Sequence, residues 1–211
     1  GTATTTHLEV QRSEDAGTTW EALRLTTDTA GVAAGTSADL YDYEAPNGTL
    51  MSYRVRALHE VSAGNNVASD WAATATATWT DTDWWLKCPE QPALNMVVVP
   101  ASLPGWQRPS RHGEFQAIGS QETVIVADTR GPARGTLRLQ IDTPAEQDDL
   151  DALLDTNSTL LLQGPAAHHF TGRYVRFGDQ DRARWIDKAW VGEVLDTLQW
   201  GEVAKPDGIV A

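Results

Sequence analysis

The chain has 211 residues, a formal net charge of −13 and hydrophobic residues at 41% of its positions. This length is enough for one large all-β domain or for two ordinary domains with packed cores. The charge and the lack of a basic patch argue against a nucleic-acid partner, because phosphate binding requires clustered lysine and arginine. No apolar run reaches the length of a membrane span, so no membrane insertion is predicted.

The first half of the chain shows short strands separated by turn residues, without helical periodicity. Apolar and polar residues alternate on both sides of a turn from Glu14 to Gly17, which predicts a β-hairpin. The predicted strands of this half span residues 7–13, 18–25, 38–43, 51–58 and 73–79. Strands at this spacing are typical of a β-sandwich.

Three pieces of this half resemble the later strands of a fibronectin type III module: the hairpin QRSEDAGTTW, the strand YRVRA and the closing strand after Ser69. The resemblance implies a fibronectin type III-like β-sandwich over residues 1–80. The two opening strands of such a module are missing, and the first residue is Gly1. We therefore expect a piece of a longer protein, or a sheet that a partner completes by strand addition.

Residues 81–111 differ in composition from both neighbours. Trp84, Trp85 and Leu86 form a sudden apolar run, and prolines follow at positions 89, 92, 100, 104 and 109. Proline disfavours helix in the residue before it and keeps a chain extended. We predict an extended linker here, with the tryptophans anchoring it on the domain that follows and an edge strand over residues 96–99.

A strand, a short helix and a second strand form the most clearly patterned part of the second half. Thr143, Pro144 and Glu146 supply the N-cap, the first-turn proline and the acid of a capping box, so a helix is predicted over about 144–156. Its apolar face carries Leu150, Leu153 and Leu154. The acids predicted to face water are Asp148, Asp149, Asp151 and Asp155.

Alternation predicts strands over residues 136–142 and 173–177, and the Leu160–Leu162 run predicts a well-covered strand over 159–163. Further strands are predicted over residues 114–118 and 123–127. Residues 178–181 are predicted to form a turn, and residues 207–211 a tail beyond the ordered structure. The sequence thus predicts a mostly β domain over 112–206 with one flanking helix.

No convincing enzyme site is present, and we predict that the protein is not an enzyme. His168 and His169 could be metal ligands or a general base, but adjacent residues on a strand point to opposite faces and cannot share one ion. Asp179 and Asp181 follow a glycine as in a calcium loop, but arginines stand where further oxygen ligands are needed. Cys88 lies in the proline-rich segment without a catalytic signature. No catalytic, cofactor or metal site is predicted.

Nine tryptophans are spread over both halves. Most are expected in the core or as anchors of the linker. Exposed ones would suit a protein interface or stacking on a sugar, because a flat aromatic ring offers a large contact area. We single out Trp71 and Trp106 as the candidate interface or glycan contacts.

The second half also resembles a known family. The pieces that carry the resemblance are, in order, WWLKCPEQPALNM, GEFQAIGSQETVIVADTRGPARGTLRL, the helix with its LLLQGP tail, YVRFGD and the closing GEVAKP. Over residues 84–206 they resemble the tail-structural domain of minor tail proteins in long-tailed bacteriophages, which is akin to distal tail proteins. The resemblance implies a β-barrel-like domain with one flanking helix, assembled as a ring at the tail tip. The segment HHFTG departs from the smoother strand expected there.

Two hypotheses of different kinds follow. The first is a structural component of a phage tail tip or baseplate that contributes to host attachment. It would be located in the virion after assembly in the host cytoplasm, and its partners would be other tail proteins and further copies of itself. Many sheet edges favour it, because edges in a soluble protein need a neighbour. The second is a carbohydrate-binding module that contacts a glycan on a bacterial surface through exposed tryptophans.

Overall fold

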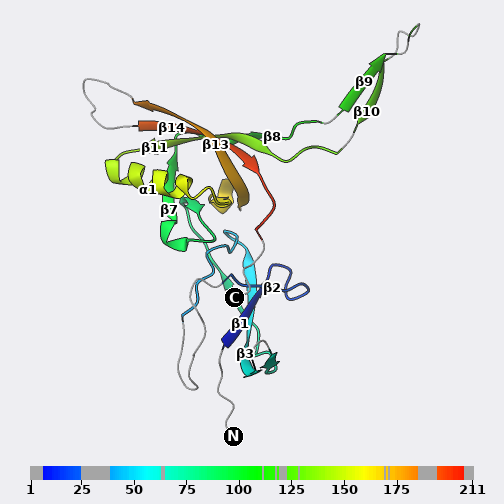
Figure 1. Ribbon diagram of the computed structural model, residues 1–211, viewed down its shortest axis with the longest axis vertical. Coiled ribbons are helices and arrows are strands. Elements are labelled where there is room, and N and C mark those ends of the chain that lie inside the picture. Colours follow the sequence, from blue (N-terminus) through cyan, green and yellow to red (C-terminus); the bar gives the residue numbers. More distant parts are fainter. Residues whose placement is uncertain are drawn as a thin grey trace. The chain divides into compact units, whose positions relative to one another are not determined.

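A computed structural model describes residues 7–24, 39–62, 65–110, 112–116, 118, 123–127, 129–168, 170, 172–184 and 194–206. Within these residues the chain is mostly β, with curled, barrel-like sheet structure and one α-helix (Figure 1). This confirms the predicted fold class. No helix in these segments is long and apolar enough to cross a bilayer.

The chain divides into two compact units. The first comprises Gly1–Asn95, Leu161–Gly172 and Pro206–Ala211, and the second comprises Met96–Leu160 and Arg173–Lys205. The chain therefore passes from one unit to the other more than once. The predicted domains, 1–80, 81–111 and 112–206, are each continuous in the sequence, whereas the two units are not.

The sheet of the first unit is built around β3 (Leu50–Ser62). This strand pairs antiparallel with β1 (His7–Ser13), β4 (Asn65–Ala68) and β5 (Ala75–Thr78), and β1 also pairs with β2 (Glu21–Ala22). The predicted hairpin of β1 and β2 is confirmed, although β2 is much shorter than expected. The long alternating run around β3 gives the longest strand of this unit, as its pattern predicts.

No strand forms over residues 39–43, where one was predicted. Asp42 instead accepts hydrogen bonds from the guanidinium of Arg12 and the hydroxyl of Tyr53. Arg12 is only 2% exposed and also pairs with Glu21. Because a buried arginine needs carboxylate partners, the side chain of Asp42 serves this ion-pair network, and its segment takes a path outside the sheet.

The stretch predicted as a linker contains the strand expected over residues 96–99 and further regular structure. Within it lie β6 (Trp84–Lys87), the 3₁₀ turn η1 (Pro92–Leu94), β7 (Met96–Pro100) and β8 (Gly105–Gln107). In the first unit β6 pairs antiparallel with β12 (Leu160–Gln163), and Leu86 and Leu162 lie opposite each other without exposed surface. The apolar run that suggested an anchored linker is thus a buried strand.

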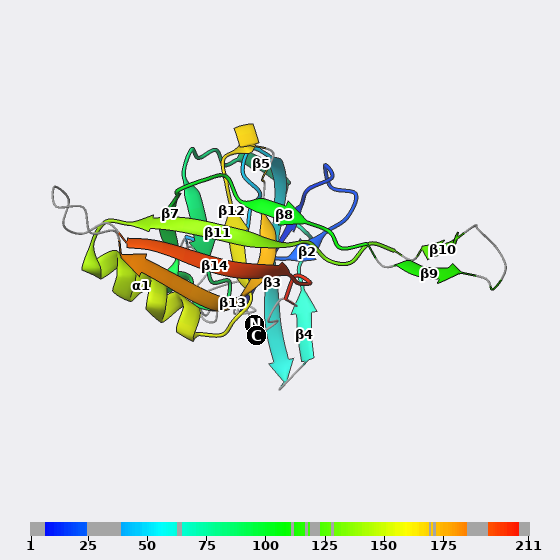
Figure 2. The ribbon, with the colours of Figure 1, turned by 90° about the horizontal axis from the view of Figure 1, so that it is seen from above.

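The central strand of the second unit is β11 (Arg134–Ile141), and Figure 2 shows it side by side with its neighbouring strands. It pairs antiparallel with β7, β8 and β14 (Val194–Glu202), and β14 pairs in turn with β13 (Arg173–Arg184). Its predicted alternation is confirmed, since Leu137, Leu139 and Ile141 are buried.

The prediction of a turn over residues 178–181 is wrong. β13 runs through these residues, and its register against β14 shifts between Phe177 and Gln180. A β-bulge absorbs extra residues without ending a strand. Gly178 and the polar residues after it therefore mark an irregularity within β13.

The predicted helix is confirmed as α1 (Pro144–Asp155). Thr143 accepts a hydrogen bond from the Glu146 amide, and the Glu146 carboxylate accepts one from the Thr143 amide, which completes the capping box. Leu150 and Leu153 have no exposed surface, whereas Leu154 is half-buried. One predicted surface acid, Asp151, instead pairs with Arg182 of β13.

Thr143→Ala is expected to lower the free energy of unfolding of the second unit by about 1 kcal/mol, because the first-turn amide of Glu146 loses its acceptor. Urea unfolding with a far-ultraviolet circular dichroism signal measures this loss. Thr143→Ser keeps the acceptor and serves as the control. An equal loss of stability in the serine variant would mean that the stability comes from the methyl group of Thr143 and not from its hydrogen bond to the helix.

The strands β9 (His112–Gln116) and β10 (Thr123–Ala127) form a ribbon of their own (Figure 1). Val124 lies opposite Phe115, and Val126 lies opposite Gly113. The prediction of a strand over 123–127 is confirmed. Neither strand pairs with any other strand in the described part of the chain.

Candidate functional site

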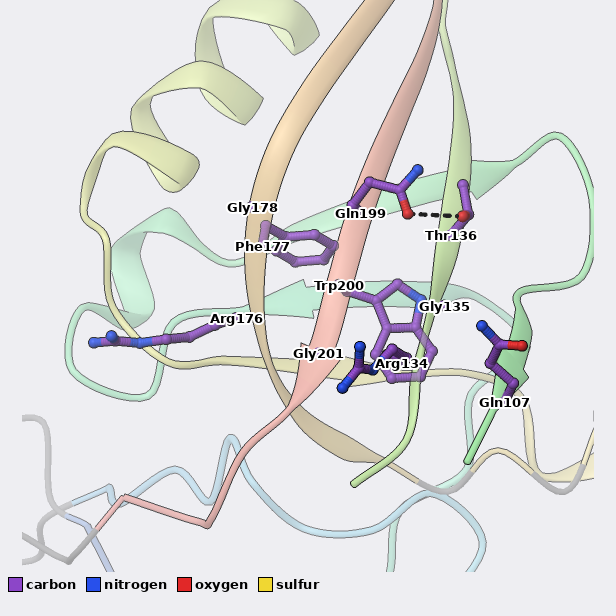
Figure 3. A pocket seen from close by; sticks show the side chains of 10 residues that line it. All are labelled: Gln107, Arg134, Gly135, Thr136, Arg176, Phe177, Gly178, Gln199, Trp200 and Gly201. Carbon is purple, nitrogen blue, oxygen red and sulfur yellow. Dashed lines mark hydrogen bonds between the residues drawn. The ribbon is translucent and has the colours of Figure 1, made fainter. Parts of the chain in front are cut away.

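Four strands of the second unit line an open groove of about 490 Å³ (Figure 3). The lining residues come from β8, β11, β13 and β14. They are Gln107, Arg134, Gly135, Thr136, Arg176, Phe177, Gly178, Gln199, Trp200 and Gly201. Gln199 and Thr136 are joined across the groove by a side-chain hydrogen bond of 3.1 Å.

The cross-strand register brings the polar lining residues together. Gly201 of β14 lies opposite Arg134 of β11 on one side and opposite Arg176 of β13 on the other. Gln107 of β8 lies opposite Arg134 on its far side. Directly paired residues share a face of a sheet, so the two arginines flank the glycine on one face.

Gly201 leaves the space between the two arginines open. A Cβ atom added to it would meet nothing within 4 Å. Since neighbouring strands lie about 4.8 Å apart, the Cα atoms of Arg134 and Arg176 are separated by about 10 Å. Two long side chains at this spacing can each bind one carboxylate.

Gly135 and Trp200 also line the groove, and they lie opposite each other next to the pair of Arg134 and Gly201. Trp200 is only 3% exposed. A Cβ atom added to Gly135 would overlap the carbonyl oxygen of Gly105 and lie 2.9 Å from the Trp200 ring. A larger residue at position 135 would therefore displace β8 or the tryptophan.

Arg134 and Arg176 are both exposed, and neither side chain has a hydrogen-bond or ion-pair partner among the described residues. The nearby Arg173 and Arg108 differ, because both reach the carboxylate of Glu202. In a chain of net charge −13, two unpaired guanidinium groups make the groove a local positive site. Arginine binds carboxylates through paired hydrogen bonds, so the groove suits an acidic ligand.

Trp106, a predicted contact residue, lies next to the groove but on the opposite face of β8 from Gln107. It is 51% exposed, and the guanidinium carbon of Arg173 lies 4.8 Å from its ring centroid. Trp106 therefore presents exposed aromatic surface, as an interface or glycan contact requires.

Trp71, the other predicted contact residue, belongs to the first unit and is half-buried. The guanidinium carbons of Arg54 and Arg56 lie 4.1 and 4.4 Å from its ring centroid, and Arg54 also lies 4.1 Å from the ring centroid of Trp20. Residues i and i+2 of a strand are about 7 Å apart, which accommodates one flat ring between them. The stacked arginines thus occupy the Trp71 surface that a sugar would need.

A second cavity, also about 490 Å³, lies in the first unit and is mostly apolar. Its lining residues are Val10, Leu23, Leu40, Tyr41, Asp42, Ala45, Tyr53, Ala77, Thr78 and Trp79. The Asp42 carboxylate in it is already engaged by Arg12 and Tyr53. Burial, with the Asp42 charge, raises the pKa of Tyr53, so this tyrosine stays neutral across the physiological range.

Lys87 of the first unit is a buried lysine. Its Nζ atom donates a 3.0 Å hydrogen bond to the Tyr43 carbonyl, and it lies 4.3 Å from the Trp79 ring centroid. Burial lowers the pKa of Lys87 to about 8, against the opposing effect of Asp42 and other acids. An aromatic ring favours the cation, but here desolvation prevails.

Wild-type stability is expected to rise between about pH 8 and pH 10, because the unfolded chain holds the Lys87 proton up to its ordinary pKa of 10.5 while the folded chain releases it near 8. Below pH 8 both states are protonated and the burial cost of the charge is fully present. Lys87→Met should lack this rise, which we expect to be roughly 2 kcal/mol. Urea unfolding of both proteins at closely spaced pH values measures the difference, and parallel curves would contradict it.

The other residues that the sequence suggested as metal ligands or catalytic groups do not lie together. His168 stacks on Trp84, with ring centroids 6.1 Å apart, and His169 lies outside the described residues. Cys88 is fully buried, and Asp179 and Asp181 are exposed on β13. Within the described ranges, no three histidine, cysteine or acidic side chains gather as a metal site would require.

No protein-family model and no curated protein matches this chain. The groove's own geometry is therefore the basis for assigning it a ligand. The sequence alone does not reveal the groove, because Arg134, Arg176 and Gly201 are joined only by strand register. One signal was present: a glycine inside an alternating strand often marks a close approach or an open space, and Gly201 is such a residue.

Proposed function

We propose that the protein is a structural component of a phage tail tip or baseplate, which assembles with copies of itself and with other tail proteins into a ring. The ribbon of β9 and β10 carries this proposal. An isolated two-stranded hairpin is at best marginally stable in water. Docking on a neighbouring chain would stabilise it.

The strand edges support the same proposal. All the residues of β5 and of β8 are exposed, and in the described part of the chain β5 pairs only with β3 and β8 only with β11. Exposed edges offer unpaired backbone groups to another chain. A closed ring pairs such edges within the assembly rather than leaving them to aggregate.

The resemblance of residues 84–206 to the tail-structural domain of phage tail proteins supports the tail as the place of assembly. That resemblance implies a barrel-like β domain with one flanking helix, which is the fold class observed. The groove adds support of a different kind, because it offers a charged surface to which a neighbouring chain can bind.

Particle mass and electron microscopy test the proposal. We expect the wild-type chain to form closed rings, alone or with its tail partners. Val124→Asp with Val126→Asp, which places charges at two paired positions of one face of the ribbon, should prevent assembly. Thr123→Asp with Ala127→Asp adds the same charge at positions of the other face and is the matched control. A wild-type chain that stays monomeric under all conditions and never enters tails would contradict the proposal.

The exposure of Trp106 favours a second candidate function, which is binding of a cell-surface glycan. One arginine lies over the Trp106 ring, whereas two lie over the Trp71 ring, and half of the Trp106 surface is exposed. Exposed aromatic surface suits stacking on a sugar. In a glycan array, Trp106→Ala should abolish binding, and Trp71→Ala should not, because the Trp71 ring is stacked against arginines. If the wild type binds no bacterial surface saccharide, this candidate is rejected.

A further inference from the structure

Two exposed acids of α1 lie on the face of the helix that points away from the core. Asp148 and Asp155 are seven residues apart, which is nearly two full turns, so they share one face. They lie roughly opposite Leu150 and Leu153, the buried residues of α1. Neither acid has a partner among the described residues, whereas Asp151 is held by Arg182.

The spacing of these acids matches the spacing of the groove arginines. Seven residues of α-helix span about 10.5 Å, and the Cα atoms of Arg134 and Arg176 are about 10 Å apart. The glycine between the arginines leaves room for a helix surface to approach. Two carboxylates on one helix face can therefore meet two guanidinium groups at once.

The two surfaces are separate parts of one chain. Arg134 is the first residue of β11 and α1 begins three residues after its last, Ile141. The middle of α1 lies beside β13, because Asp151 pairs with Arg182. Such separated, complementary surfaces join head to tail, and repeated head-to-tail contacts close into a ring when the rotation allows.

We propose that the groove of one copy binds the acidic face of α1 of a second copy, with Asp148 and Asp155 paired to Arg134 and Arg176. This inference rests on the self-assembly proposed above and names the contact that joins one copy to the next. The contact is charged and near the surface, so assembly weakens as ionic strength rises.

Charge reversal tests the contact by sedimentation or mass measurement. Arg134→Glu with Arg176→Glu, and separately Asp148→Lys with Asp155→Lys, should each lower the assembly affinity by at least ~100-fold, because like charges then face each other. An equimolar mixture of the two variants should assemble, since every groove then meets a helix of opposite charge. If the mixture assembles, misfolding of the variants cannot be the reason that each variant alone fails to assemble.

Matched controls carry the same change in charge elsewhere. Arg130→Glu with Arg138→Glu, and Asp179→Lys with Asp181→Lys, alter exposed residues outside the groove and α1, and both should assemble like the wild type. If the wild type assembles and the groove variant assembles equally well, the contact is refuted while the proposed function stands. If the wild type itself never assembles, both proposals fail.

Discussion

Leu153→Ala is expected to lower the free energy of unfolding of the second unit by about 2 to 5 kcal/mol. Leu153 has no exposed surface, so the substitution removes buried apolar atoms and leaves a cavity that the surrounding residues fill only in part. Urea unfolding followed by circular dichroism measures the loss. Hydrogen exchange, read separately for amides of each unit, shows whether the loss is confined to the second.

The adjacent leucine provides the control. Leu154→Ala makes the same chemical change on the same helix, but Leu154 is half-buried and should lose less than half as much stability. The helix propensity of the two variants is equal, because both introduce alanine. Equal losses of stability in the two variants would contradict the difference in burial between Leu153 and Leu154.

Arg12→Met is expected to cost about 3 to 5 kcal/mol in the first unit, because it removes one member of a buried ion-pair network. The Asp42 side chain is only 9% exposed and would lose its guanidinium partner. Burial alone would lower the pKa of Arg12, but Asp42 and Glu21 together raise it. The guanidinium therefore remains charged in place, and its loss leaves the Asp42 carboxylate without its ion-pair partner.

Glu21→Gln separates this effect from general damage to the network. The Glu21 side chain is 43% exposed, so water can replace the lost interaction and the cost should stay below about 1 kcal/mol. Both variants are compared by urea unfolding and by exchange of the amides of β1 and β3. A cost for Glu21→Gln that equals that of Arg12→Met would contradict the decisive role of burial.

Local patterns predicted those elements whose causes are local. The capping box of Thr143 and Glu146 fixed the start of α1, and the run of β-branched residues at 123–127 marked β10. Such features depend on residues a few positions apart. They can be predicted from the sequence because the physical cause lies within the same window as the pattern.

The errors arose where a distant residue decides the local conformation. A strand was predicted around Leu40 and Tyr41, but the neighbouring Asp42 partners Arg12, thirty positions earlier. Residues 178–181 resemble a turn, but pairing with β14 carries β13 through them as a bulge. The groove was missed for the same reason, since no pattern within β11, β13 or β14 indicates which residues will lie opposite.

The stacked arrangement of Trp20, Arg54, Trp71 and Arg56 links three segments that are separate in the sequence. Trp20 precedes β2, the arginines belong to β3, and Trp71 follows β4. None of these segments can move far without separating a cation from an aromatic ring. The turn, the long strand and the returning segment should therefore open and close as a single cooperative element, and their amides should show a common free energy of opening.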